Sequence, residues 1–216
     1  MNARNAAIPA IAALLAALAG NAVAAAPEAA SIIERLARPA PAITSFVEVR
    51  HAALLTRPLV VRGELEYRGP RALEKRIEAP WRERLVIDGN EVQVLREGEK
   101  PRRFSLNRAP ELRGILDSFG ALLAGDRSAL EARYSMTVEG SDDAWRLSLK
   151  PRDPRAARYV RDVVVTGGGS SPWCFVMTEP DGDASYTLLD AASKVTLPEP
   201  PTRTWLEQHC RDGGKK

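Results

Sequence analysis

The stretch that decides the fold reads Val61-Arg62-Gly63-Glu64-Leu65-Glu66-Tyr67-Arg68. Apolar or small residues stand at its odd positions and charged residues at its even positions. A period of two with one charged side is typical of an antiparallel strand that has one face in water. The stretch therefore predicts a sheet with one wet and one apolar face.

The same alternation continues on both sides of this strand. Gly69-Pro70 predicts a turn, and Asp88-Gly89-Asn90 predicts a hairpin because its tight turn needs positive φ. Further strands are predicted over Ala72–Glu78, Trp81–Ile87, Glu91–Leu95, Arg103–Leu106, Ser135–Glu139, Ala144–Lys150, Tyr159–Thr166, Trp173–Thr178 and Ala184–Leu189. The sum is roughly ten antiparallel strands.

Three segments have the helical period instead. Glu28–Ala37 carries Ile32, Ile33 and Leu36 on one face. Pro110 begins a second helix, whose apolar stripe consists of Leu112, Ile115, Leu116, Phe119, Leu122 and Leu123. Gly125 ends that helix, and Asp126 caps a third helix that runs to about Tyr134. The chain is therefore mainly β, with a helical insertion near its middle.

The N-terminus predicts export. Arg4 precedes an apolar run from Ala6 to Ala19, and Ala22-Val23-Ala24 is a small-residue cleavage site. This order is typical of a secretory signal peptide, and the run is shorter than the roughly 20 residues that span a bilayer. We expect a signal peptide over residues 1–24 that is cleaved, one domain over residues 25–197, and a polar C-terminal tail over residues 198–216.

The composition argues against a nucleic-acid partner and leaves open whether the two cysteines form a disulfide. The 31 basic and 28 acidic residues are interspersed along nearly every segment, so no basic face for nucleic acid is predicted. Cys174 and Cys210 could form a disulfide in an oxidising compartment, or they could be two unpaired thiols. Sequence separation does not decide between these alternatives.

The sequence shows no catalytic constellation. Nucleophilic catalysis of the Ser/His/Asp or Cys/His type needs a histidine, and the only two are His51, within a strand, and His209, in the polar tail. No residues have zinc-ligand spacing, and Asp181-Gly182-Asp183 lacks the remaining ligands of a calcium loop. We expect no enzyme, no cofactor and no metal.

Alternation alone favours a sheet packed on helices over a sheet that encloses a ligand cavity. A set of short motifs, in fixed order from residue 45 to residue 187, changes that balance. They are Ser45-Phe46-x-Glu48-x-Arg50, Pro58-Leu59, Gly63-x-Leu65-x-Tyr67-x-x-Pro70, Leu73-Glu74-Lys75, Pro80, Ile87-Asp88-Gly89, Leu122-Leu123-Ala124-Gly125-Asp126, Trp145-x-Leu147-x-Leu149-x-Pro151 and Gly182-Asp183-x-Ser185-x-Thr187. Their order resembles the outer-membrane lipoprotein carrier family (LolA/LolB-type), in particular its divergent LolA-related branch.

The resemblance implies an unclosed antiparallel β-barrel of about ten to eleven strands, covered by a lid of helices. Lipid chains would lie between lid and sheet. The residues expected to line that space are Phe46, Leu65, Tyr67, Leu85, Val92, Val94, Leu112, Ile115, Leu116, Phe119, Trp145 and Leu147. Leu112, Leu116 and Phe119 are expected to fill the space when it is empty.

The resemblance also implies a function. We expect a soluble, monomeric periplasmic carrier that binds the acyl chains of a lipoprotein or another lipid. It would move them from an inner-membrane donor to an outer-membrane acceptor, with only transient membrane contact. The alternatives are a lipid-sensing regulatory module of the same fold and, much less favoured, a hydrolase that uses His51.

One position departs from the family. The founding members have a lid-latching arginine directly before the proline of the second hairpin, where this chain has Gly69. Arg68, the candidate latch, is one residue earlier, and a shift of one residue turns a strand side chain to the opposite face.

Overall fold

A computed structural model describes residues 27–213, apart from the side chains of residues 110–112. Its strands are β1 (Ala42–His51), β2 (Leu59–Gly69), β3 (Ala72–Ala79), β4 (Glu83–Asp88), β5 (Glu91–Arg96), β6 (Arg102–Ser105), β7 (Tyr134–Ser141), β8 (Ala144–Pro151), β9 (Asp162–Gly168), β10 (Ser171–Thr178) and β11 (Ala184–Leu189). Each stretch that the sequence predicts as a strand overlaps one of these strands.

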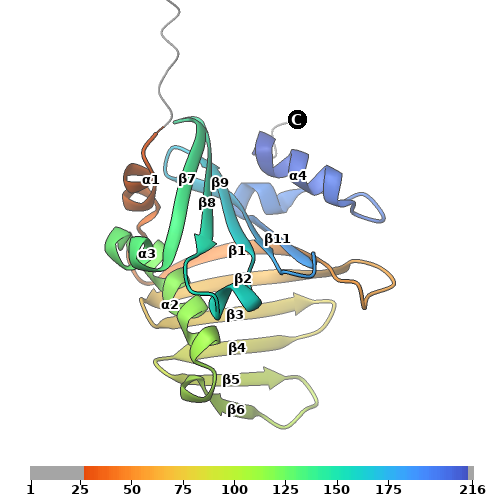
Figure 1. The fold of residues 1–216 in the computed structure, drawn as a ribbon. Coiled ribbons are helices and arrows are strands. Elements are labelled where there is room, and N and C mark those ends of the chain that lie inside the picture. The colour runs from red at the N-terminus through yellow and green to blue at the C-terminus, as the bar shows by residue number, and fades with distance from the viewer. Residues whose placement is uncertain (1–26, 214–216) are drawn as a thin grey trace, which may run out of the picture.

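All of these strands belong to one antiparallel sheet, in the order β6-β5-β4-β3-β2-β1-β11-β10-β9-β8-β7. The sheet curves strongly but does not close, because β6 and β7 are its two edges (Figure 1). These two strands are consecutive in the chain, and the connection between them contains helices α2 (Pro110–Ala124) and α3 (Arg127–Arg133). The predicted unclosed barrel with a helical lid is confirmed.

The helix boundaries follow local signals in the sequence. Helix α1 covers Ala29–Leu36, and α2 ends at Gly125, which has a φ of 70°. Asp126 caps α3, because its carboxylate accepts a hydrogen bond of 3.0 Å from the Ala129 amide. Three short 3-10 turns complete the connections: η1 (Leu106–Arg108), η2 (Ala156–Arg158) and η3 (Asp190–Lys194).

The two faces of the sheet are covered by different helices. Residues directly opposite one another on paired strands share a face. We call the face against α1, α2 and α3 the inner face. It carries Leu147 of β8 and Val165 of β9, which pack with Ile32 and Ile33 of α1. The outer face carries Val49 and Tyr186 and packs against the C-terminal helix.

The segment expected as a polar C-terminal tail, residues 198–216, contains a helix. Residues Arg203–Asp212 form helix α4, and Thr202 caps it by accepting a hydrogen bond of 3.2 Å from the Trp205 amide. Leu206 and Cys210 lie one turn apart and are buried on the outer face. A helix with so few apolar residues is stable because these two positions pack against the sheet.

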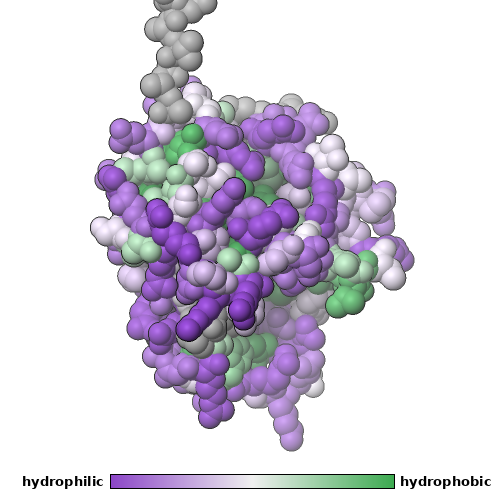
Figure 2. Space-filling model, in the orientation of Figure 1, coloured by the Kyte–Doolittle hydropathy of each residue, from purple (hydrophilic) through white to green (hydrophobic). Residues whose placement is uncertain are grey.

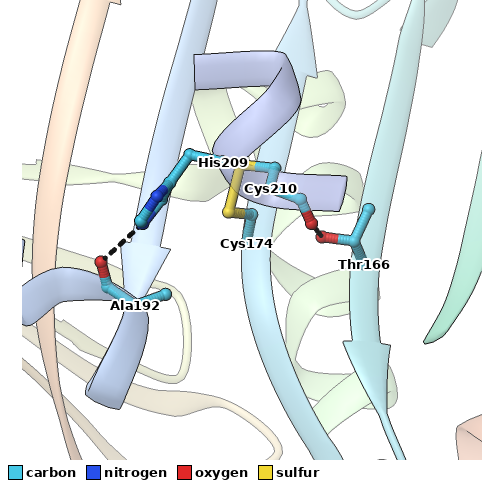
Figure 3. Close-up of a disulfide and its surroundings, with 5 residues drawn as sticks. All are labelled: Thr166, Cys174, Ala192, His209 and Cys210. Atoms are coloured by element: carbon cyan, nitrogen blue, oxygen red, sulfur yellow. Dashed lines mark hydrogen bonds between the residues drawn. A yellow bond between two sulfur atoms is a disulfide. The ribbon is translucent and has the colours of Figure 1, made fainter. Parts of the chain in front are cut away.

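A disulfide fixes α4 to that face. Cys174 of β10 is bonded to Cys210, with 5.5 Å between their Cα atoms (Figure 3). Beside it, the Thr166 hydroxyl donates a hydrogen bond of 2.8 Å to the Cys210 carbonyl. Of the two alternatives for the cysteines, the structure contains the disulfide.

The predicted signal peptide lies outside the described residues. Within residues 27–213, none of the helices combines the length and the apolar character needed to cross a membrane.

Candidate functional site

The inner face of strands β2–β6 is a largely apolar surface. Strand register places Tyr67, Leu73, Ile87, Val92 and Phe104 in one row across these strands. A second row contains Leu65, Leu85 and Val94. We call these eight residues the apolar floor. Its members are mostly only partly buried, and Phe104 is 43% exposed.

Charged side chains adjoin the apolar floor. The Lys75 ammonium lies 2.7 Å from a Glu48 carboxylate oxygen and 5.1 Å from the centre of the Phe46 ring. Glu83 of β4 pairs with Arg96 of β5 at 2.8 Å. Both pairs are on the inner face, since Lys75 is opposite Leu65 and Glu83 is opposite Ile77. We call these two ion pairs the polar border.

The inner face of strands β7–β10 is a closed core. Trp145 and Leu147 are at most 1% exposed, and the Trp145 indole donates a hydrogen bond of 3.1 Å to the Gly169 carbonyl. Ile32 and Ile33 of α1 are fully buried against this core. A ligand cannot reach these side chains without the removal of α1.

Helix α2 bridges the closed core and the apolar floor. Its residue Leu122 is buried in the closed core, whereas Leu116 packs against Ile87, Val92 and Leu106. Between these contacts, the Phe119 ring lies 4.3 Å from the Phe175 ring of β10, measured between ring centres.

The space under α2 is small. A hollow of about 20 Å³ is lined by Ile115, Ser118, Phe119, Leu122, Leu130, Tyr134, Leu149, Val163 and Phe175. One water needs about 10–15 Å³ by this kind of measure, so an acyl chain does not fit in this conformation. Binding of a chain therefore requires displacement of α2.

Two kinds of contact hold α2 beside the β2–β3 turn. A Cβ atom at Gly120 would lie 1.9 Å from the Pro70 carbonyl oxygen, so only glycine allows this approach. The Asp117 carboxylate lies 3.7 Å from the Arg71 guanidinium and 3.8 Å from that of Arg133. These separations are long and the arginines are about half exposed, so the ion pairs contribute little.

Arg68 does not hold the lid in this structure. Its guanidinium lies on the outer face, where it donates hydrogen bonds to Glu66 at 2.8 Å and to Glu74 at 2.5 Å. The physical reason is the alternation along β2: Tyr67 faces the helices, so the next side chain faces away. The contacts that the structure shows between α2 and the β2–β3 turn are those of Gly120 and Asp117.

Glu74 makes the outer face of β2–β4 a charge network. Its side chain is 1% exposed and receives hydrogen bonds from Arg68, Arg76 and Arg84. The hydrogen bond from Arg84, together with the charges of Arg84 and Arg68, lowers the pKa of Glu74 to about 2, although burial opposes the shift. The carboxylate is therefore ionised throughout the physiological range.

The residues predicted from sequence fall into three groups. Leu65, Tyr67, Leu85, Val92 and Val94 lie on the apolar floor, and Ile115, Leu116 and Phe119 of α2 face the sheet. Phe46, Trp145 and Leu147 lie on the inner face but are almost fully buried, Phe46 next to Lys75. The side chain of Leu112 lies outside the described residues.

Sequence reasoning missed the strand residues around Phe119. Tyr134, Leu149, Val163 and Phe175 line the hollow. Strands β9 and β10 are apolar on both faces, because α4 covers the outer one, so alternation does not reveal which side chains face inward. The polar border was also missed, because Glu48 and Lys75 are far apart in sequence.

A second, larger hollow of about 670 Å³ lies at the β3–β4 and β5–β6 turns. It is open and mostly charged, and its lining comprises Arg76, Ile77, Glu78, Arg82, Glu83, Arg84, Leu95, Arg96, Glu97, Glu99 and Pro101. Ile77, Glu83 and Arg96 connect it to the inner face. Its charged lining makes it unsuitable for an acyl chain.

Neither histidine is placed beside a nucleophile among the described residues. Burial lowers the pKa of His51, whose ring lies edge-on to Tyr186 at 6.1 Å. The His209 ring donates a hydrogen bond of 3.1 Å to the Ala192 carbonyl (Figure 3). The same ring stacks on Trp205. The carboxylates of Glu179, Asp181 and Asp183 approach one another within 4.8 Å, but Arg50 and the Ala53 and Asp183 amides bind them. What the inner face can do chemically is bind an apolar chain.

The chain is similar to several solved structures. A LolA superfamily protein from Nitrosomonas europaea, NE2245, is 16% identical, with a TM-score of 0.42 over 84% of this chain and 100% of that one. LprF from Mycobacterium bovis is 14% identical, with a TM-score of 0.38 over 82% and 100%. A chain of the MucA/MucB complex structure from Pseudomonas aeruginosa is 16% identical, with a TM-score of 0.35 over 74% of this chain and 53% of that one.

No curated protein sequence matches the chain. The family model described as outer membrane lipoprotein carrier protein LolA-like matches residues 21–211, which is most of the chain. The chain therefore belongs to the LolA-like family of outer membrane lipoprotein carrier proteins.

Proposed function

We propose that this protein is a soluble periplasmic carrier that binds acyl chains of a lipoprotein or another lipid between the apolar floor and α2. The observation that carries the proposal is the partly exposed apolar floor beneath a helix whose stripe faces it. Figure 2 shows hydrophobic residues over the lower strands, framed by hydrophilic ones. Family membership supports the same ligand class.

The small hollow under α2 sets the energetics of binding. A sheltered chain gains about 0.8 kcal/mol per methylene. In the empty protein, Phe119 and Leu116 occupy the position that the chain would take, and their contacts with Phe175 and the floor must be broken first. This opposing cost keeps binding reversible, as a carrier requires.

Uptake of a fluorescent acyl probe tests the proposal. We expect Phe119→Glu to abolish uptake, because a carboxylate under α2 would have to be desolvated against the chain. Ile43→Glu is the control, since Ile43 is 62% exposed and lies away from the floor. Equal uptake by both variants and the native protein contradicts the site. A protein partner that binds tightly without lipid indicates a regulatory module instead.

A protruding loop supports transient membrane contact. Leu54 is 97% exposed and Leu55 is 41% exposed in the β1–β2 loop, which forms a hydrophobic patch at the right of Figure 2. The Ala53 amide fixes the base of the loop, because it donates a hydrogen bond of 2.8 Å to the Asp183 carboxylate. Two leucines offer far less area than the roughly 800 Å² per partner of a stable protein interface, but they suit shallow insertion into lipid.

Vesicle co-sedimentation tests this contact. Replacing both leucines with glutamine should remove most binding to phosphatidylcholine vesicles, whereas Ile43→Gln should leave it unchanged. Unaltered sedimentation of the double variant contradicts a membrane role for the loop. Acyl-probe uptake by the double variant is expected to remain, because the loop lies outside the apolar floor.

Export to the periplasm is supported by two independent features. The predicted signal peptide of residues 1–24 directs secretion. The Cys174–Cys210 disulfide is typical of proteins in an oxidising compartment. We expect the mature protein to purify from the periplasm as a monomer that begins at Ala25.

A further inference from the structure

The polar border begins within the second row of the apolar floor, where Lys75 lies between Leu65 and Leu85, and it continues in the next row with Glu83 and Arg96. Along β3, Leu73 belongs to the floor, but two residues later the inner-facing side chain is Lys75. Along β4, Leu85 belongs to the floor, and the neighbouring inner-facing residue, two positions earlier in the strand, is Glu83. A chain that extends along the strands from α2 therefore meets charge after one or two side-chain rows.

The Glu48–Lys75 pair is both ordered and hydrated. The ammonium and carboxylate lie 2.7 Å apart, and Thr187 adds a hydrogen bond of 3.4 Å to the same Glu48 oxygen. The two side chains remain 24% and 22% exposed, so water reaches them from the concave side. A methylene group placed over the pair would remove this water without replacing its hydrogen bonds, which is unfavourable.

The Glu83–Arg96 pair extends the border toward open solvent. The Glu83 carboxylate lies 2.8 Å from the Arg96 guanidinium, which lies 5.0 Å from the centre of the Trp81 ring. Glu83 and Arg96 also line the hollow of about 670 Å³ at the strand turns. Polar groups of a ligand would find water and hydrogen-bonding partners there, whereas an acyl chain would not.

We propose that the two ion pairs of the polar border stop the acyl chain and turn the polar head of the ligand toward the charged hollow. The border thereby selects the length of the chain that the protein shelters. This inference rests on the proposed function, because it assumes that chains lie on the apolar floor beneath α2.

A chain-length series tests the border. Monoacylglycerols of increasing length compete with one fluorescent acyl probe, and their uncharged heads make the result independent of head-group charge. For the native protein, affinity should rise roughly fourfold per methylene until the floor is full, and then level off. In the double variant Glu48→Leu with Lys75→Met, the plateau should move to longer chains by several methylenes.

Both partners are replaced together, because a single replacement would leave an unpaired charge on the inner face. The matched control is Glu66→Leu with Arg68→Met, a 2.8 Å pair on the outer face of β2 whose two residues do not line the charged hollow. We expect this control to keep the native plateau. A second border variant, Glu83→Leu with Arg96→Met, should also lengthen the preferred chain.

The outcomes separate the two proposals. If the native protein binds the series but both border variants keep its plateau, the border does not limit chain length and the inference is overturned. If the native protein binds no monoacylglycerol and no probe, the proposed function itself fails. If the outer-face control moves the plateau as far as the border variants do, the effect is general loosening of the sheet and contradicts the border.

Discussion

The two halves of the inner face are built differently although one continuous sheet forms both. Over β7–β10 the inner side chains pack against α1, α2 and α3, and Trp145 and Leu147 are almost inaccessible. Over β2–β6 the row that includes Ile87 and Val92 is partly buried under α2, whereas Leu65, Leu85, Val94 and Phe104 are partly exposed and are bordered by ion pairs. The first half resembles an ordinary protein core, and the second resembles a surface that another molecule completes.

The comparison shows how one sheet can combine stability with an open face. The closed half supplies the apolar burial that stabilises the fold. The open half cannot rely on its inner face, and its outer face compensates with the network of Glu74, Arg68, Arg76 and Arg84. Helix α2 contacts both halves, so displacing its part over the floor leaves its contacts with the closed core in place.

The largest expected effect comes from matched leucine truncations in the two halves. Leu147→Ala in the closed half should lower the free energy of unfolding by about 3–5 kcal/mol, because it leaves a cavity in a sealed core. Leu85→Ala on the apolar floor should cost less than about 2 kcal/mol, since that side chain is only partly buried. Urea unfolding measures both values, and equal costs contradict the division into halves.

Acid is expected to lower the free energy of unfolding by an intermediate amount. Glu74 has a folded pKa of about 2 against an ordinary value of 4.5, so its contribution to stability is complete above pH 4.5 and is lost as the pH falls toward 2. We expect a loss of roughly 2–3 kcal/mol, with amide exchange in β2–β4 rising before that in β7–β10. Glu74→Gln should be less stable at neutral pH and should lose this part of the pH dependence.

The smallest expected changes in stability come from alanine substitutions at two glycines of α2. Gly120→Ala should destabilise the protein by about 1–3 kcal/mol and increase acyl-probe uptake, because the new methyl group pushes α2 from the Pro70 carbonyl. Gly114→Ala should instead stabilise it by up to about 1 kcal/mol, since its methyl group meets only the flexible Arg133 side chain. Thermal unfolding and probe uptake check both, and the same sign for the two variants contradicts the close contact.

Much of the fold could be predicted because local patterns agree with the final structure. The period of two in β2, the Asp-Gly hairpin and the Gly125-Asp126 joint each specify their conformation without help from distant residues. Helix α4 could not be predicted in this way. Its stability depends on Leu206 and Cys210 reaching a particular face of a sheet, and that contact is not written in the helix itself.

The candidate site was predicted only in part for a related reason. Alternation identified which β2 and β5 residues share the floor, but it could not tell an open row from a sealed one. Phe46, Trp145 and Leu65 have equally good strand patterns, yet only neighbouring segments decide their exposure. The Glu48–Lys75 pair requires the register between three strands, which single-strand periodicity does not contain.

The unpaired edges β6 and β7 have a mechanical consequence. Residues 106–133, which include the whole of α2 and α3, are the only covalent path that leads directly from one edge to the other. Any widening of the sheet must therefore pull on the lid, and the reach of this tether limits how bulky a bound molecule can be. In the proposed carrier, admission of an acyl chain and widening of the half-barrel would therefore be one coupled movement, limited by the length of a single connection.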